Sequence, residues 1–316
     1  MAIITNTFTT YSGIGIREQL ADVIYNISPT DTPLLSGAKK GTATNTFFEW
    51  QTDVLAAAAA NAQLDGDDIA AFTAVTPTVR IGNRTQISRK TFIVSGTEEI
   101  VNKAGRKSDV AYLIAKAGKE LKRDMEFALT QNTTAITGSS GVARQTRGLE
   151  GWVGGTNSNL GVGGVAAAPT TNTAPTDGTQ RYLSEAMVKD ALKQAFVSGG
   201  NPDTLMVGPF NKQMVSTFTG NATRMDSDST DQKLYAAISV YVSDYGSITC
   251  IPNRFQRDRT AFALQLDMFT VMYLRPFQVV ELAQTGDAQK RMLIAEYGLM
   301  VGNEASSAAV RDLLTS

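Results

Sequence analysis

A few short motifs in this sequence have residue types and spacings that could support chemistry. Asp226, Asp228 and Asp231 are spaced like the first ligands of a calcium-binding loop, but the glycine and glutamate needed at its sixth and twelfth positions are missing. Residues 161–166 (GVGGVA) match the letters of a dinucleotide-binding turn, yet no strand precedes them and the segment that follows is a poor helix former. We interpret both motifs as loops, and expect no cofactor and no metal ion.

The histidine and cysteine counts exclude many common mechanisms. The 316 residues include no histidine, which excludes a Ser-His-Asp triad, a Cys-His dyad and histidine-ligated metals. The single cysteine, Cys250, lies in an apolar β-like run and is predicted to be a buried hydrophobic side chain. Glu98 and Glu99 are predicted to begin a short helical turn, where adjacent residues do not face each other as an acid/base pair. We therefore expect that the protein is not an enzyme.

The net charge of −1 hides an uneven distribution of charge. Residues 1–79 carry 3 basic and 8 acidic side chains, residues 80–147 carry 13 and 6, and residues 148–316 carry 13 and 16. The near-neutral total argues against a strongly basic protein that neutralises nucleic-acid phosphates, and the lack of a basic run with interleaved aromatic residues argues against sequence-specific reading of nucleic acid. No apolar run reaches the ~20 residues of a membrane-spanning helix, and the N-terminus lacks the pattern of a signal peptide. We expect a protein that folds in a reducing cytoplasm without membrane contact.

The first 95 residues are predicted to form an arm and then a long hairpin. Residues 1–46 are rich in Thr, Ser and Gly, and Pro29 and Pro33 impose extended geometry on the residues before them. Residues 47–95 are predicted to be a two-stranded hairpin, because Phe48 and Trp50 alternate with polar neighbours and residues 73–95 form a second β-rich run. An isolated hairpin is only marginally stable in water, so we expect this one to contact another copy of the chain.

One long helix is predicted from residue 108 to residue 131. Apolar residues recur there at spacings of three and four, Ser108 is a good N-cap, and Asp109 favours the positive end of the helix dipole. The other side of this helix carries basic residues, namely Lys116, Lys119, Lys122 and Arg123. The helix is predicted to belong to a unit of residues 96–180 that continues into a glycine-rich connection.

The rest of the sequence is predicted to be a long loop and a compact domain. Residues 138–180 contain ten of the 27 glycines, which is typical of a loop. Residues 181–316 are predicted to form a compact α+β domain, with a helix from Tyr182 to Val197 that ends at Gly199-Gly200 and a second helix opened by Pro209. Strands are expected at residues 204–207, 238–242, 248–251, 261–266, 271–274, 279–282 and 291–301.

The order of these elements resembles the Hong Kong ninety-seven capsid fold of tailed-bacteriophage major capsid proteins. The segments NISPTDTPLL (26–35), FEWQTDVL (48–55) and KRMLIAEYGLMVGNEASSAAVRDL near the end are similar to a podovirus-like group of these proteins. The resemblance covers nearly the whole chain. It implies an α+β fold with an N-terminal arm (1–46), an extended E-loop hairpin (47–95), a spine helix with part of the P domain (96–180), and an A domain with a C-terminal return to the P domain (181–316).

The resemblance further implies a protein that self-assembles into the icosahedral head shell of a tailed phage. The expected partners are other copies of the chain in hexamers and pentamers, with portal and decoration proteins as further candidates. The long helix starts near residue 108 and leaves no room before it for the large cleaved scaffolding region of some relatives, so we expect a separate scaffolding protein. The shell is expected to enclose double-stranded DNA without sequence recognition, in a virion assembled in the host bacterial cytoplasm.

The charge distribution suggests how neighbouring copies meet. The acidic tip of the hairpin is predicted to dock near basic residues of an adjacent subunit, where such pairs set register more than affinity. The acidic residues are Asp65, Asp67 and Asp68, and the candidate basic residues are Arg84, Arg89, Lys90 and Lys116. Two alternatives remain for the tip: the aspartates only keep it soluble, or they ligate a hard cation.

Three other functions remain open at this point. An encapsulin-like shell would use the same fold to enclose a cargo enzyme, and nucleic acid inside purified particles would distinguish a virus from it. A tail or decoration protein would form a tube or a trimer instead of a closed shell. A hydrolase or binding enzyme would show itself in an activity screen.

Overall fold

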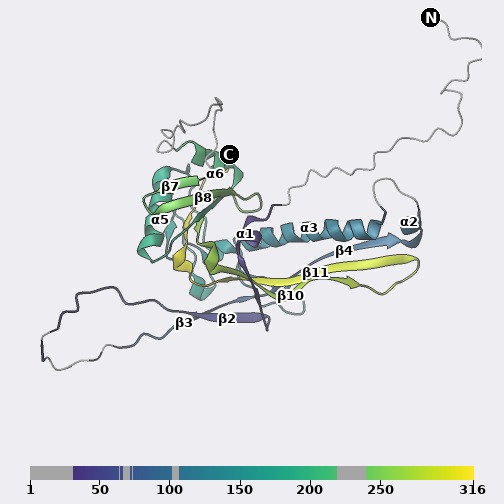
Figure 1. Cartoon of the computed structure of the whole chain (residues 1–316), viewed down its shortest axis with the longest axis horizontal. Helices are drawn as coiled ribbons and strands as arrows, with labels where there is room; N and C mark the ends of the chain where they lie inside the picture. Colours follow the sequence, from purple (N-terminus) through teal and green to yellow (C-terminus); the bar gives the residue numbers. More distant parts are fainter. Residues whose placement is uncertain (1–30, 64, 67–71, 73, 102–106, 219–239) are drawn as a thin grey trace, which may run out of the picture.

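The structure of the chain is a computed structural model that describes residues 31–63, 65–66, 72, 74–101, 107–218 and 240–316. Figure 1 shows an elongated body built along the helix α3 (Asp109–Thr130), a compact unit at one end of it, and a hairpin near their junction. The hairpin loop and the far end of the elongated body point in opposite directions. Helices and strands are mixed as predicted, and the fold class is α+β.

The elongated body is a helix packed on a four-stranded sheet. The strand order is β1 (Lys39–Thr42), β10 (Phe269–Glu281), β11 (Ala288–Val301) and β4 (Gln86–Ser95), with only β1 and β10 parallel. The α3 helix begins after Ser108, whose hydroxyl accepts a hydrogen bond from the Ala111 N–H, as the capping pattern predicts. It buries Leu121, Met125 and Leu129 in the core that it shares with the sheet. The short helix α2 (Gly96–Ile100) follows β4 at the far end.

The hairpin is shorter than the sequence predicts. The strand β2 (Phe47–Thr52) pairs with β3 (Val79–Arg84) in an antiparallel ribbon, whereas β4 pairs with β11 of the four-stranded sheet. The prediction of one strand over residues 73–95 is therefore wrong. The chain changes sheets at Thr85, whose buried hydroxyl donates to Glu296 at 2.8 Å while its backbone N–H donates to the Thr46 carbonyl. These two bonds fix the chain between the ribbon and the sheet.

Part of the predicted arm is anchored in the core. Residues 1–30 lie outside the described residues, but the helix α1 (Pro33–Gly37) and β1 belong to the elongated body. Leu34 and Leu35 are buried, and their backbone N–H groups donate to the Glu126 carboxylate of α3 at 2.9 and 2.8 Å. The expectation that residues 1–46 make few internal contacts fails for this part, because two adjacent leucines carry no periodic signal.

The compact unit is a six-stranded sheet with helices packed against it. The strand order is β5 (Ser158–Asn159), β12 (Ala308–Val310), β9 (Ala261–Leu264), β6 (Thr204–Val207), β8 (Gly246–Pro252) and β7 (Val240–Ser243). The helices α5 (Glu185–Val197) and α6 (Pro209–Ser216) bury Val188, Leu192 and Val215 in a second core. The helix that ends at Gly199, the strand at 204–207 and the helix opened by Pro209 are confirmed; Gly199 has φ +86°, a region that favours glycine.

The strands β10 and β11 connect the compact unit to the elongated body. The sequence predicts two strands at 271–274 and 279–282, but the structure has one continuous strand whose pairing with β11 shifts register around Arg275. A bulge at this point absorbs Pro276, which has no N–H to donate to a ladder. Short 3-10 turns, η3 (Leu266–Met268) and η4 (Glu304–Ser306), lead into β10 and β12.

The glycine-rich connection is held in place by buried charges. It contains the helix α4 (Leu149–Trp152), β5 and the turn η1 (Pro169–Thr171). Glu150 is fully buried and pairs with Arg257 at 2.8 Å and Arg311 at 3.5 Å. Arg147 is also buried and donates to three backbone carbonyls between residues 168 and 173. Removing one partner of a buried ion pair is strongly destabilising, so this connection is an integral part of the fold.

Candidate subunit-contact site

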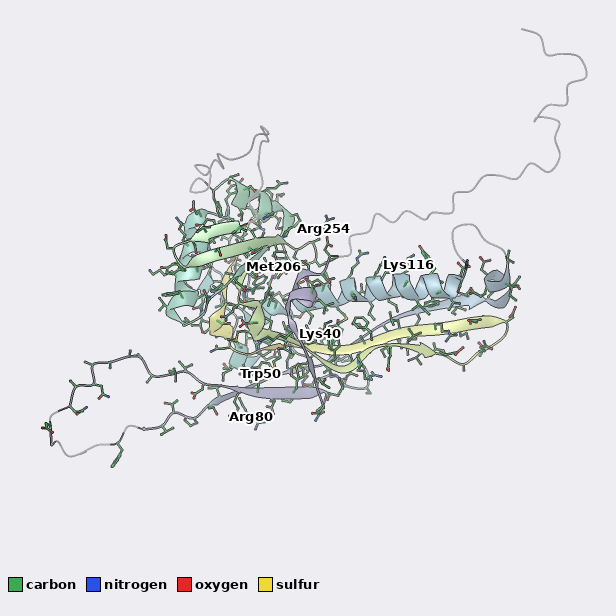
Figure 2. The ribbon with its side chains drawn as sticks, viewed as in Figure 1. Lys40, Trp50, Arg80, Lys116, Met206 and Arg254 are labelled. Atoms are coloured by element: carbon green, nitrogen blue, oxygen red, sulfur yellow. The ribbon has the colours of Figure 1, made fainter. Side chains whose placement is uncertain are left out.

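The base of the hairpin is fixed to the body by inward-facing aromatic side chains. The Trp50 ring lies 5.3 Å from the Trp152 ring of α4 and 6.0 Å from the Phe48 ring, measured between centroids. The opposite side of the ribbon is polar apart from Phe47, with an exposed ion pair between Arg80 and Glu49 at 2.5 Å. Figure 2 shows Trp50 between the ribbon and the body, and Arg80 on the far side of the ribbon. The alternation predicted for Phe48 and Trp50 is confirmed.

Asn83 of β3 adds a buried polar anchor to this base. Its side-chain amide donates to the Leu299 carbonyl at 2.6 Å, and its side-chain oxygen accepts from the Arg147 N–H at 2.9 Å. The side chain is fully buried, so these bonds replace water on both of its polar ends. The ribbon is therefore held rigidly at the point where it leaves the body.

The hairpin loop, residues 53–78, has the opposite character. Every described residue in it is exposed. Four of these residues are large and apolar, namely Val54, Leu55, Phe72 and Val75, and their side chains are 85–92% exposed. Of the predicted acidic tip, Asp65 is exposed, whereas Asp67 and Asp68 lie outside the described residues. Sequence reasoning named the aspartates and missed the apolar side chains, which carry the stronger drive for contact.

The four candidate basic residues do not form one surface. Lys90 pairs with Asp124 of α3 at 2.6 Å, and Lys116 lies on α3 itself, 3.9 Å from Glu120. Both are on the helix side of the four-stranded sheet.

The other two basic residues lie elsewhere. Arg84 is at the end of β3, with its guanidinium 4.7 Å from the Phe47 ring centroid. Arg89 is exposed on β4 and forms no ion pair with any described residue. One docked acidic tip therefore cannot use all four basic residues, and Arg89 is the one of the four with neither an ion pair nor an aromatic ring contact to a described residue.

Arg89 lies on a partly apolar face of β4. Ile87 and Ile93 point to the same side of the strand as Arg89 and are 46% and 63% exposed, while Phe92 on the other side packs into the α3 core. This side of the sheet, opposite α3, combines apolar side chains with an unpaired cation. The alternation in residues 86–95 could have predicted two faces, but it could not show which of them α3 covers.

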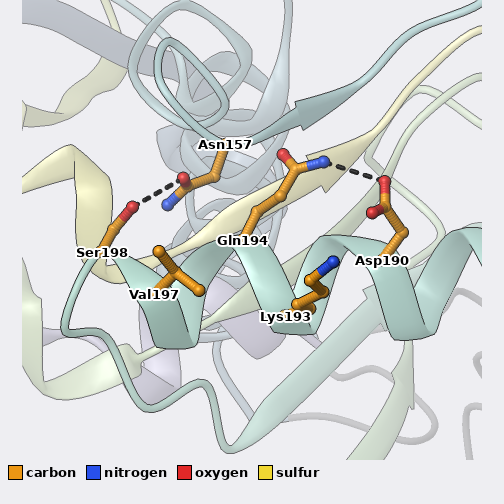
Figure 3. A pocket seen from close by; sticks show the side chains of 6 residues that line it. All are labelled: Asn157, Asp190, Lys193, Gln194, Val197 and Ser198. Carbon is orange, nitrogen blue, oxygen red and sulfur yellow. Dashed lines mark hydrogen bonds between the residues drawn. The ribbon is translucent and has the colours of Figure 1, made fainter.

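The pocket in Figure 3 is a feature of the compact unit. It has a volume of about 270 Å³ and is lined by Asn157, Asp190, Lys193, Gln194, Val197 and Ser198. Its polar side chains bond to one another: Ser198 donates to Asn157 at 2.9 Å and Gln194 to Asp190 at 2.8 Å. The first bond joins the C-cap of α5 to the residue before β5, and the second lies within α5.

Other side chains that could take part in chemical reactions are buried in the fold. Cys250 is buried, and burial raises the pKa of its thiol, which leaves little reactive thiolate. Burial likewise raises the pKa of Glu126 and of Glu150, although hydrogen bonds to the first and arginine charges near the second oppose the shift. Both carboxylates bind elements of the fold to each other. No group of three or more metal-ligating side chains gathers within the described part of the chain.

Of the two loop motifs found in the sequence, one lies within the described residues and the other does not. Residues 161–166 form a loop in which Gly163 has φ +81°, as the loop interpretation predicts. Asp226, Asp228 and Asp231 lie in the range 219–239, outside the described residues. Among the described residues, no helix has both the length and the apolar character to cross a membrane.

Comparisons with known proteins agree with this architecture. The model of the SU10 major capsid protein family matches residues 3–314. The chain is 28% identical over 335 residues to the major capsid protein of Escherichia phage Phieco32, and the match covers 95% of each protein.

Solved structures show the same fold at low sequence identity. The Cyanophage A-1(L) capsid asymmetric unit aligns with a TM-score of 0.68 at 14% identity, over 96% of this chain and 98% of that one. The capsid of a native GTA particle aligns with a TM-score of 0.63 at 14% identity, over the same shares. The predicted Hong Kong ninety-seven type fold is confirmed, and the encapsulin-like alternative is not favoured. The chain belongs to the SU10 major capsid protein family and is the major capsid protein of a tailed-phage head shell.

Proposed function

We propose that this major capsid protein builds its shell by laying the hairpin loop, residues 53–78, across an adjacent copy. The observation that supports this most directly is the exposure of four large apolar side chains on a loop whose base is rigidly held. A closed shell repeats similar contacts between copies of one chain, so a loop that reaches outward finds a similar surface on each neighbour. Rings of five and six copies, the pentamers and hexamers of the shell, supply these neighbours.

The energetics favour many modest contacts. Full burial of one large apolar side chain contributes about 1.5–3 kcal/mol, from which the cost of ordering the loop is subtracted. One docked loop is therefore a weak contact. Repeated around a closed ring, such contacts make the shell stable, while a wrongly placed copy still dissociates during assembly.

The acceptor for the loop is the face of β4 that carries Ile87, Arg89 and Ile93. Its exposed isoleucines match the apolar side chains of the loop, and Arg89 supplies a charge opposite to that of the acidic tip. Lys90 has its own partner within the chain, and Lys116 lies on the helix side of the sheet, so they are not acceptors. Arg89 sets the register of the loop, and the apolar side chains supply most of the affinity.

The shell encloses double-stranded DNA without sequence recognition, which suits a chain of net charge −1 that does not bind its cargo tightly. The protein has no histidine and acts as a structural protein, not as an enzyme. A separate scaffolding protein, a portal and decoration proteins join it in the host cytoplasm.

Charge reversal at the tip tests the docking step. The triple variant Asp65→Lys, Asp67→Lys, Asp68→Lys should lower the yield of closed particles about ten-fold, since each lysine then faces Arg89 of the neighbour. The melting temperature of the unassembled chain should change by about 2 °C at most, because exposed surface charges contribute little to folding. Electron microscopy with sedimentation measures the yield. Adding Arg89→Glu to the triple variant should restore assembly, while normal shells from the triple variant alone would reject the proposal.

A further inference from the structure

The side of α3 that faces away from the sheet is a cationic ridge. The ridge consists of Lys116, Lys119, Lys122 and Arg123, which follow one another at intervals of one to three residues and lie opposite the buried Leu121 and Met125. Lys119 and Lys122 are exposed and form no ion pair with any described residue. Figure 2 shows Lys116 on the outer side of the helix, away from the strands.

The acidic residues of the same helix leave most of this ridge unneutralised. Asp124 is on the flank of α3 next to the sheet, where it pairs with Lys90 at 2.6 Å. Glu120 is 3.9 Å from Lys116, a distance typical of a loose ion pair on a helix surface. Glu126 is fully buried and binds backbone N–H groups of α1. The outermost part of the helix is therefore positively charged.

Arg254 extends the ridge beyond the end of α3. The exposed Arg254 precedes Phe255, whose carbonyl accepts hydrogen bonds from Thr130 at 3.1 Å and Gln131 at 3.0 Å. The Arg123 guanidinium lies 5.6 Å from the Phe255 ring centroid, and its Nε is buried with no hydrogen-bond partner in the described structure. Figure 2 places Arg254 and Lys116 on the same side of the molecule.

We infer that this ridge is the surface that touches the sugar-phosphate backbone of the enclosed double-stranded DNA. The inference rests on the proposed function, in which the shell encloses such DNA. At about 1.5 Å of rise per residue, Lys116 and Arg123 are separated by about 10 Å along the helix, a span that reaches neighbouring phosphates. Flexible lysines act as point charges and read no sequence.

Two further observations favour DNA over a protein partner. The opposite face of the sheet carries the exposed isoleucines and the free Arg89 proposed to receive the loop of a neighbour, so subunit contact and DNA contact fall on opposite sides. The ridge is also poor in the large apolar groups that protein interfaces bury, since Phe127 is the only such side chain exposed on α3. A few unpaired cations on each chain give a contact that salt weakens and that leaves the DNA free to exit.

The test compares two double variants of equal charge change. Lys119→Glu with Lys122→Glu alters the ridge, and Lys39→Glu with Lys40→Glu alters the exposed strand β1. The probe is a DNA duplex of about 30 base pairs in two unrelated sequences, and its binding to the unassembled full chain is followed by fluorescence anisotropy from about 50 to 200 mM salt.

The wild-type chain is expected to bind both duplex sequences equally, with an affinity that falls as the salt concentration rises. The ridge variant should lose at least about ten-fold in affinity, and its slope of log K against log salt should fall by about 2. The β1 variant should change by less than about two-fold. Equal losses in both variants, or no loss in the ridge variant, would overturn the inference. So would a polyglutamate peptide that binds the ridge more tightly than the duplex, because the partner would then be an acidic protein. Shell yield, measured separately by electron microscopy, reports on the loop-docking proposal and not on the ridge.

Discussion

The base and the loop of the same hairpin are built from opposite kinds of contact. At the base, Trp50 lies 5.3 Å from Trp152 and Asn83 is fully buried, whereas every described residue of the loop 53–78 is exposed. Both regions contain large apolar side chains. At the base, Ile81 is buried and Trp50 is partly buried against the body, whereas the apolar side chains of the loop have no cover from the chain. This difference indicates that the base contributes to the stability of the folded chain, whereas the loop contributes to contacts between copies.

Shortening the loop should produce the largest effect. Replacing residues 55–75 by a short Gly-Ser turn removes Leu55, Phe72 and Val75 and leaves the ribbon intact. Closed shells should disappear, while the free energy of unfolding of the monomer should change by about 0.5 kcal/mol or less, because exposed residues contribute little to folding. Sedimentation measures the assembly and urea unfolding the stability. A shortened chain that still forms complete shells would show that the loop is not needed for assembly.

Removing the aromatic anchor should have the next largest effect, and this effect should be on the stability of the monomer instead of on assembly. Trp50→Ala leaves a space against Trp152 and should lower the free energy of unfolding by about 3 kcal/mol. The matched control is Gln51→Ala, the exposed neighbour on the outward side of the same strand, which should change it by about 0.5 kcal/mol at most. Urea unfolding of both variants decides the matter. Equal effects would show that the inward face of the ribbon has no special role.

The exposed ion pair on the outward side of the ribbon should matter least. Glu49→Ala removes the partner of Arg80, whose side chain is 67% exposed. Solvent screens such pairs, so the expected loss in unfolding free energy is about 0.5 kcal/mol or less. A double-mutant cycle with Arg80→Ala measures the coupling directly. A coupling energy above about 1 kcal/mol would mean that the outward face also anchors the hairpin.

Local signals predicted much of the fold. Ser108 and the apolar stripe that follows it predicted α3 to within one residue at each end, because a cap and a periodic pattern are properties of neighbouring residues. Pro209 and Gly199 marked the ends of helices for the same reason. The order of elements then carried the resemblance to capsid proteins.

Long-range contacts account for what the sequence did not predict. Thr85 divides the predicted strand 73–95 between two sheets because it binds Glu296, a residue 211 positions away. Leu34 and Leu35 are anchored by Glu126, 92 and 91 positions away. At the candidate site, the aspartates and cations were visible as charges, but only the packing of α3 shows that Lys90 is paired and that Arg89 is free.

The docking of the loop on a neighbouring β4 can be tested directly by disulfide trapping in assembled shells. Cys250 is buried, so the chain offers little background reactivity. The double variant Asp65→Cys, Arg89→Cys should form a ladder of covalently linked chains under mild oxidation, up to closed rings. The control variant Asp65→Cys, Arg254→Cys, with its second position on the α3 side, should stay monomeric on a denaturing gel. A ladder from the first variant alone is the predicted result. Normal shells in which the first variant remains entirely monomeric would contradict the account.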